Sequence, residues 1–157
     1  CIRDRYNGVW GGCEAAVAEM ARVCRPGGHI GLTYWGAADR LDLLSYFMTI
    51  ATAAPGVSEE IAELAAINQP GVAETILTNE GFFDVRFGAA DAVLEFVDAD
   101  AAWRALRSPG LIVPAIDHTG ETAMRRRVLD AIDPFRSDDG TYRLVNELVH
   151  VVARRNG

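Results

Sequence analysis

The amino-acid sequence predicts an α/β fold, in which helices alternate with the strands of one sheet. Three stretches lead to this class. Residues 13–35 contain the pattern of an amphipathic helix, a Pro-Gly-Gly turn and an apolar strand, and residues 72–87 contain that of a helix, a Gly-Phe turn and a strand. Residues 142–153 form a long β-rich stretch after an Asp-Asp-Gly turn. Helix-to-strand steps of this kind build a sheet that is covered by helices.

The composition narrows the class of protein. The chain has 157 residues, of which 50% are hydrophobic, so we expect one domain or part of one. Twenty-two acidic and fifteen basic side chains give a net charge of -7, which argues against binding to nucleic acid. No apolar window is long enough for a membrane span. The three cysteines show no CxxC spacing and the histidines are scattered, so we expect a cytoplasmic protein with no metal site.

The first helix and strand can be assigned from their chemistry. Cys13, Val17, Met20 and Cys24 follow helical spacing and form one stripe. The Pro-Gly-Gly turn at residues 26–28 ends this helix, because proline cannot continue it and glycine accepts the left-handed cap conformation. The next segment, His29 to Trp35, is apolar on both faces, which predicts an interior strand between two layers of helices.

Three helices are predicted to follow. Asp39 is expected to cap an apolar helix that ends near Ala53 and is either deeply buried or covers a pocket. Ser58 is expected to cap a short second helix, and Pro70 to lie in the first turn of a third. Gly81 then supplies the left-handed cap that ends the third helix.

The remaining elements are a strand, two helices and a final strand. Alternation places Phe83, Val85 and Phe87 on one face of the strand, and we expect Gly88 to Asp91 to break it with a bulge or a turn. Asp98 or Asp100 is expected to cap the next helix. A loop over residues 108–118 and a helix over residues 120–132 precede the strand at 142–153.

Two of these segments resemble one protein family. The helix end and strand EMARVCRPGGHIG and the unit TILTNEGFFDVRF are similar to the segments that lead into the fifth and sixth strands of class I S-adenosylmethionine-dependent methyltransferases, particularly the type 11, or UbiE-like, group. The resemblance extends over residues 13–155. It implies a partial Rossmann-like sheet of the fifth, sixth and seventh strands, in which the seventh is antiparallel and lies between the other two.

The resemblance also shows what the chain lacks. These enzymes hold the cofactor on a glycine-rich loop after the first strand, with an acidic residue at the end of the second strand bound to the ribose. The glycines at residues 8–12 follow no strand, and Gly27-Gly28 lies between a helix and a strand, so no cofactor-binding residue can be identified. We therefore expect about 100 residues of the parent protein to precede the sequence, and no tight binding of S-adenosylmethionine by this chain alone.

The domain limits follow from the same comparison. We expect residues 1–12 to be a disordered or non-native tail, in which Trp10 is either an anchor on the core or an exposed remnant. Residues 13–157 would then form the carboxyl-terminal half of a methyltransferase domain.

Candidate substrate contacts are chosen by position. Ligands of open α/β sheets gather at the carboxyl ends of strands, where Thr33, Tyr34 and Trp35 lie; the alternative for the two aromatic residues is packing under the next helix. Segments 39–53 and 108–118 stand where family members carry substrate-covering insertions, which selects Phe47, Met48 and His118.

No catalytic residue can be assigned. His118 beside Asp117 stays open as a general base, although a solvent-exposed pair is the simpler interpretation. His29 is predicted to be structural, and His150 to face a helix within the core.

The resemblance implies a fragment of a methyltransferase for a small-molecule acceptor such as a quinone, a lipid or another metabolite. The alternative is a noncatalytic α/β remnant that forms homodimers through the exposed edge of the strand at residues 29–35. A third interpretation is another Rossmann-like protein, such as a nicotinamide enzyme. The Gly81-Phe82 unit and the long final strand argue against it.

Overall fold

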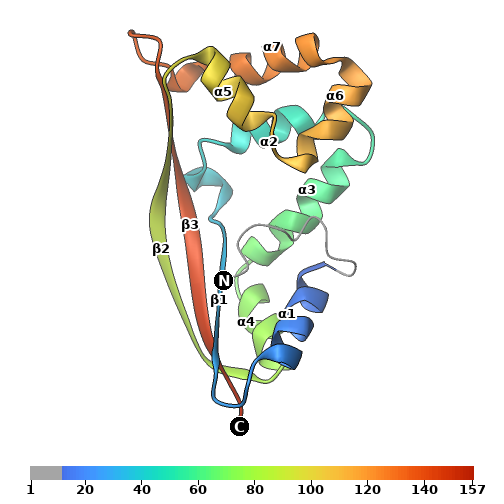
Figure 1. Cartoon of the computed structure of the whole chain (residues 1–157), viewed down its shortest axis with the longest axis vertical. Coiled ribbons are helices and arrows are strands. Elements are labelled where there is room, and N and C mark those ends of the chain that lie inside the picture. Colours follow the sequence, from blue (N-terminus) through green and yellow to red (C-terminus); the bar gives the residue numbers. More distant parts are fainter. Residues whose placement is uncertain (1–11) are drawn as a thin grey trace. The chain divides into compact units, whose positions relative to one another are not determined.

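A computed structural model describes residues 12–157 (Figure 1). The expectations for Trp10 and the rest of the amino-terminal tail fall on residues 1–11, outside the described part. Gly12, which we assigned to the tail, is instead the first residue of a helix. None of the described helices is long and apolar enough to cross a membrane.

The helices and strands alternate along the chain in the predicted manner. The helices are α1 (Gly12–Val23), α2 (Leu44–Ala51), α3 (Val57–Ala65), α4 (Val72–Asn79), α5 (Ala99–Leu106), α6 (Val113–Thr119) and α7 (Glu121–Ile132), and the strands are β1 (His29–Trp35), β2 (Phe82–Phe96) and β3 (Tyr142–Arg155). Short 3-10 turns occupy residues 38–40, 66–68, 110–112 and 133–135.

The chain divides into two compact units. The sheet unit comprises residues 12–36, 63–90 and 147–157, with α1, β1, α4 and one part each of β2 and β3. The helical unit comprises residues 37–62 and 91–146, with α2, α5, α6, α7 and the remaining parts of β2 and β3. The boundary near residue 62 lies within α3.

The three strands form one sheet in the order β1-β3-β2. β3 is antiparallel to β1, with His29 opposite Arg154 and Trp35 opposite Leu148. The last strand of the chain is therefore the central strand of the sheet. This is the order predicted for the fifth, seventh and sixth strands of the methyltransferase sheet, so the α/β fold class is confirmed.

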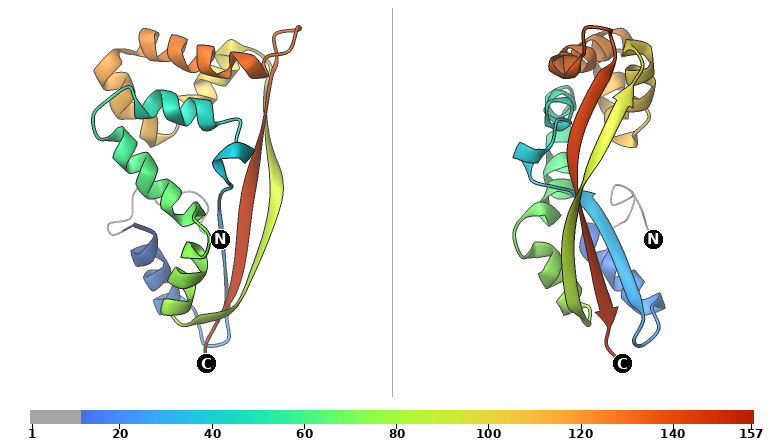
Figure 2. Two further views of the ribbon diagram at one scale, coloured as in Figure 1. Left: turned by 180° about the vertical axis from the view of Figure 1, so that it is seen from behind. Right: turned by 90° about the vertical axis from the view of Figure 1, so that its left-hand side faces the viewer.

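Within the sheet unit, α1 and α4 pack on one face of the sheet (Figures 1 and 2). Their apolar stripes and the facing side chains of the strands form the core, in which Val17, Leu32 and Phe82 are almost completely buried. The opposite face is open, because His29 and Gly31 of β1 are exposed. Within residues 12–157, β1 is an edge strand and not the interior strand covered on both faces that the sequence predicted.

The turn between α4 and β2 forms as predicted. Gly81 has a φ of 78°, the left-handed conformation that glycine adopts without strain. The guanidinium of Arg155 donates to the Glu80 carbonyl at 2.6 Å, so a side chain from β3 satisfies the end of α4.

The predicted faces of β2 are wrong at its first residues. Phe82 is 2% exposed and Phe83 is 40% exposed, while Val85 packs against the core. The cause is Asp84, which has a φ of 52° and adds one residue to the alternation of the strand. Phe83 therefore points away from the face that Val85 covers.

A turn at Gly88, one of the two predicted breaks, is wrong, since β2 continues from Phe82 to Phe96. A Cβ at Gly88 would overlap the imidazole of His150, so the glycine is required for contact between strands and not for a turn. His150 itself is exposed, contrary to the prediction that it faces a helix in the core.

In the helical unit, α2 begins five residues later than Asp39, the predicted cap. The reason is that the preceding segment is bound to β3: the Val145 N–H donates to the Asp42 carboxylate at 2.6 Å, and Leu41 forms a bridge with Asn146. This extended segment cannot be helical, because its backbone pairs with a strand.

Asn146 is the one fully buried polar residue among the described part of the chain. Its Oδ1 accepts a hydrogen bond from the Leu43 N–H at 2.9 Å. Its Nδ2 donates to the carbonyls of Ala92 and Leu144 at 3.4 and 3.5 Å. One amide thus joins β2, β3 and the start of α2.

The last helices agree with the sequence in part. Asp98 caps α5 by accepting from the Ala101 N–H at 2.7 Å, and α7 occupies the predicted range. The expected loop over residues 108–118 is wrong, because α6 forms there with Pro114 in its first turn.

Candidate functional site

The residues selected on β1 lie together at its carboxyl end. The Gly36 N–H donates to the Glu147 carbonyl at 2.8 Å, which fixes this end against β3. Asn68 donates to the Gly36 carbonyl at 3.3 Å and so holds the turn after α3 beside the strand. Asn68 was not selected from the sequence, because no pattern links it to a residue so far away in the chain.

The three selected side chains on β1 do not share a face. Tyr34 packs against the helix-covered core of the sheet unit, and burial raises the pKa of its phenol. Thr33 and Trp35 alternate with it and lie on the opposite face, where Thr33 is opposite His150. Since Tyr34 keeps its proton, it is suited to donate a hydrogen bond and not to act as a base.

The other selected residues belong to the helical unit. Phe47 and Met48 lie on α2, where Phe47 is half-buried and Met48 is 56% exposed. Leu44 is one turn before Met48 and is also exposed, so α2 presents an apolar strip to its surroundings. The structure thus places Thr33, Tyr34 and Trp35 in one unit and Phe47, Met48 and His118 in the other.

His118 lies at the end of α6 and not in a loop. Both His118 and the neighbouring Asp117 are exposed. From the sequence, the pair was a possible general base or a solvent-exposed pair. The observed exposure agrees with the second interpretation.

Tyr46 fixes the opposite side of α2. Its ring is 2% exposed, and its hydroxyl donates to the Leu106 carbonyl at the end of α5 at 2.9 Å. Burial raises the pKa of this phenol well above its usual value. α2 is therefore anchored by one face while the face of Met48 stays free.

Replacing Tyr46 by phenylalanine is expected to lower the free energy of unfolding by about 1 kcal/mol, because the Leu106 carbonyl loses its donor. A folded-state pKa above that of the unfolded chain stabilises the native protein below about pH 10, and this stabilisation is lost as the pH rises towards the folded value. Urea unfolding at about pH 7 and about pH 11 should show a smaller alkaline loss in Tyr46→Phe than in the parent. Equal losses would contradict this role for the phenol.

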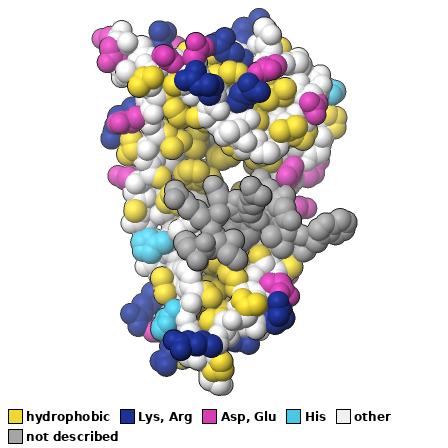
Figure 3. All heavy atoms as spheres, viewed as in Figure 1, with side chains coloured by type: hydrophobic (Ala, Val, Ile, Leu, Met, Phe, Trp, Pro, Cys, Tyr) yellow, Lys and Arg dark blue, Asp and Glu magenta, His cyan; other side chains and the backbone are white. Residues whose placement is uncertain are grey.

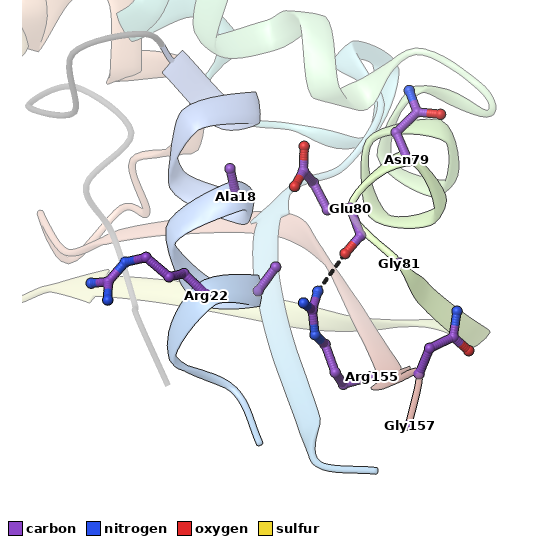
Figure 4. A pocket seen from close by; sticks show the side chains of 9 residues that line it. Ala18, Arg22, Asn79, Glu80, Gly81, Arg155 and Gly157 are labelled. Atoms are coloured by element: carbon purple, nitrogen blue, oxygen red, sulfur yellow. Dashed lines mark hydrogen bonds between the residues drawn. The ribbon is translucent and has the colours of Figure 1, made fainter. Parts of the chain in front are cut away.

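A hollow of about 530 Å³ in the sheet unit lies where α1, α4 and β3 end (Figure 4). It is lined by Ala18, Ala21, Arg22, Asn79, Glu80, Gly81, Arg155, Asn156 and Gly157. Helix carboxyl ends carry a partial negative charge, and Arg155 is already bound to the Glu80 carbonyl. We interpret this hollow as a structural junction.

A second hollow of about 270 Å³ lies on the open face of the sheet unit. Its lining is His29, Asp84, Arg86, Phe87, His150 and Val152. The sequence did not indicate it, because these residues meet only when the three strands pair in the observed order.

Residues 12–157 contain no group of three or more His, Cys, Asp or Glu side chains that could hold a metal ion. The described cysteines, Cys13 and Cys24, are not in a disulfide. Burial and the nearby Glu14 raise the pKa of the Cys13 thiol, which disfavours the reactive thiolate.

No protein-family model matches the sequence, and no curated protein matches it either. Among solved structures, the chain is similar to a protein from Bacillus halodurans C-125 that is provisionally described as a methyltransferase. The identity is 14% and the TM-score is 0.49, over 92% of this chain and 63% of the other. The chain therefore spans less than two thirds of that protein, and a function has to be argued from its own fold and side chains.

Proposed function

We propose that this chain is the carboxyl-terminal half of an S-adenosylmethionine-dependent methyltransferase domain that acts on a small-molecule acceptor. The observation that carries the proposal is the strand order β1-β3-β2, in which the last strand is antiparallel and central. The family resemblance of the sequence implies this same order. A simple succession of helix-to-strand steps would instead add the last strand at an edge of the sheet.

Both segments that carry the resemblance also fold as it requires. The first gives α1, the turn at Gly27 with a φ of 70°, and β1. The second gives α4, the turn at Gly81 and β2. The agreement therefore includes local chemistry as well as strand order.

The described side chains favour an acceptor with an apolar body. We assign Thr33 and Trp35 of the sheet unit as candidate contacts for it, and Phe47, Met48 and His118 of the helical unit are separate candidates. The exposed strip of Leu44 and Met48 suits aliphatic or aromatic groups, as in a quinone, a lipid or a similar metabolite of the UbiE-like enzymes. No described residue is assigned as the catalytic base.

The cofactor would supply the methyl group, and its glycine-rich loop would come from a segment that precedes this sequence. This chain would contribute acceptor contacts and the sheet that supports them. Positioning of the two reactants is a large part of the acceleration in such a transfer, so this chain alone should be inactive.

Thermal unfolding with S-adenosylmethionine tests the proposal. We expect no shift in melting temperature for residues 1–157. A longer chain that includes an upstream strand and glycine-rich loop should gain several degrees, since ligand at about 100 times its Kd contributes about 2.7 kcal/mol. A clear shift for residues 1–157, or none for the longer chain, would contradict it.

A second candidate is a noncatalytic module that dimerises through β1. The Arg155 N–H donates to the Gly28 carbonyl and the Gly36 N–H donates to the Glu147 carbonyl, both at 2.8 Å. Even-numbered residues of β1 therefore bond to β3, and the backbone N–H and C=O groups of its odd-numbered residues point away from β3. Within residues 12–157 no strand pairs with this edge, and no proline or lysine protects it. A dimer in sedimentation that persists in the longer chain would favour this candidate; a monomeric longer chain would favour the methyltransferase.

A further inference from the structure

The open face of the sheet unit carries an unusual set of side chains. His29 comes from β1, Asp84 and Arg86 come from β2, and His150 and Val152 come from β3, and together with Phe87 they line the hollow of about 270 Å³. Figure 3 shows histidine and basic side chains near one another on the lower left side, along the strands. We call this surface the open face.

The open face is more apolar than a solvated sheet face should be. Antiparallel sheets with one wet face usually place polar residues there. Here Phe83 is 40% exposed and Val152 is 43% exposed. Phe83 reaches this face because Asp84 adopts a φ of 52°, a left-handed conformation that aspartate tolerates better than most residues other than glycine.

The charge of the open face is opposite to that of the whole chain. Arg86 binds Asp84 through two hydrogen bonds, of 3.0 and 2.6 Å, so these two charges balance. Arg154 also lies near enough to help lower the pKa of the Asp84 carboxyl, after the larger effect of the Arg86 hydrogen bonds, and its guanidinium is 5.5 Å from the centre of the Phe83 ring. Two arginines thus share one carboxylate, so the face is positive on a protein whose net charge is -7.

One histidine of the face lies close to the backbone of the neighbouring strand. The imidazole of His150 lies over Gly88, where a Cβ would overlap it.

We propose that the open face binds an acidic segment of a partner protein. Carboxylates would pair with Arg154 and the two histidines, and an apolar side chain would pack on Phe83 and Val152. Exposed arginine and aromatic side chains around an apolar centre are the usual composition of such interfaces. A second copy fits less well, since a face-to-face dimer would bring the same positive charges together.

The probe is a capped peptide of alternating glutamate and leucine, with the lysine-leucine peptide as its charge-reversed counterpart. Two-dimensional NMR of residues 1–157, without S-adenosylmethionine, follows the signals of His29, His150 and Val152. We expect the acidic peptide to shift these signals and the basic peptide to leave them unchanged. Thr33 and Trp35, the candidate acceptor contacts of β1, lie on this same face. The readout is peptide binding and not methyl transfer, so failure of this proposal and failure of the proposed function can be told apart.

Two variants locate the contact. Arg154→Glu and Val152→Ser should each weaken binding of the acidic peptide, Arg154→Glu by roughly tenfold or more, which corresponds to at least one charge-assisted contact. Arg143→Glu is the matched control, since Arg143 is an exposed arginine of β3 in the helical unit, paired with Glu95. It should bind like the parent.

Three results would overturn the proposal. The first is equal binding of the acidic and the basic peptide. The second is an equal loss of acidic-peptide binding in Arg154→Glu and Arg143→Glu. The third is self-association of the parent chain that shifts the same signals without a peptide. The last result would assign the open face to a second copy.

Discussion

Phe82→Ala is expected to lower the free energy of unfolding by about 3–5 kcal/mol. Phe82 is 2% exposed and packs among the buried side chains of α1, α4, β1 and β3. Its ring also faces the guanidinium of Arg155 at 5.6 Å, and this arginine satisfies the end of α4. Removal of the ring therefore leaves a cavity and loosens the junction. Urea unfolding monitored by circular dichroism measures the loss.

Phe83→Ala is the matched control, because it removes the same ring one residue later. Phe83 is 40% exposed on the opposite face, so the expected loss is below about 1 kcal/mol. The regular alternation read from the sequence places Phe83 on the same face as Val85, which packs against the core. A larger loss for Phe83→Ala than for Phe82→Ala would therefore show that Asp84 does not shift the strand.

Asn146→Leu is expected to lower the free energy of unfolding by about 2–4 kcal/mol. Leucine has a similar size, so the loss comes from hydrogen bonds and not from a cavity. The buried Leu43 N–H would lose its acceptor, and the carbonyls of Ala92 and Leu144 would lose a donor. Hydrogen exchange should also show faster exchange of the Leu43 amide than of amides within α7.

Asn79→Leu serves as the control for this substitution, because Asn79 is exposed at the end of α4. Its expected effect is within about 0.5 kcal/mol. Equal effects of the two substitutions would mean that the amide of Asn146 does not hold β2, β3 and the start of α2 together.

The parts of the fold that depend on local chemistry could be predicted from the sequence. Pro26 and the following glycines mark the end of α1, and Gly81 marks the end of α4, because these residues act through their own backbone. Asp98 was one of two predicted caps and does cap α5. The central place of β3 was implied by the family resemblance, since alternation alone does not order strands.

The errors arose where distant residues decide local structure. α2 starts late because Asp42 binds the backbone of Val145, 103 positions away. A glycine within a strand pattern suggests that the strand is broken there. Gly88 instead leaves room for the imidazole of His150 from another strand. A non-glycine residue with a positive φ, as at Asp84, has no reliable sequence signal, and it reversed the face of Phe83.

The candidate site was predicted by position along the chain and not by geometry. Thr33, Tyr34 and Trp35 do lie at the carboxyl end of β1, but alternation places Tyr34 on the core face. Asn68, which binds the end of that strand, was missed, because a lone asparagine in a turn carries no pattern. The residues of the open face were missed because they come from three strands and meet only when those strands pair.

In one part of β3 the even-numbered residues are buried, and in the other part the odd-numbered residues are buried. This change of face along the strand protects the protein from misfolding. Tyr142, Leu144 and Asn146 are buried in the helical unit, whereas Val151 and Ala153 are buried in the sheet unit, so the alternation changes phase between them. A slip of one residue would bury charged or imidazole side chains in both units at once. A mispaired β3 is therefore penalised twice, and a single-residue deletion in this strand should cause aggregation during expression.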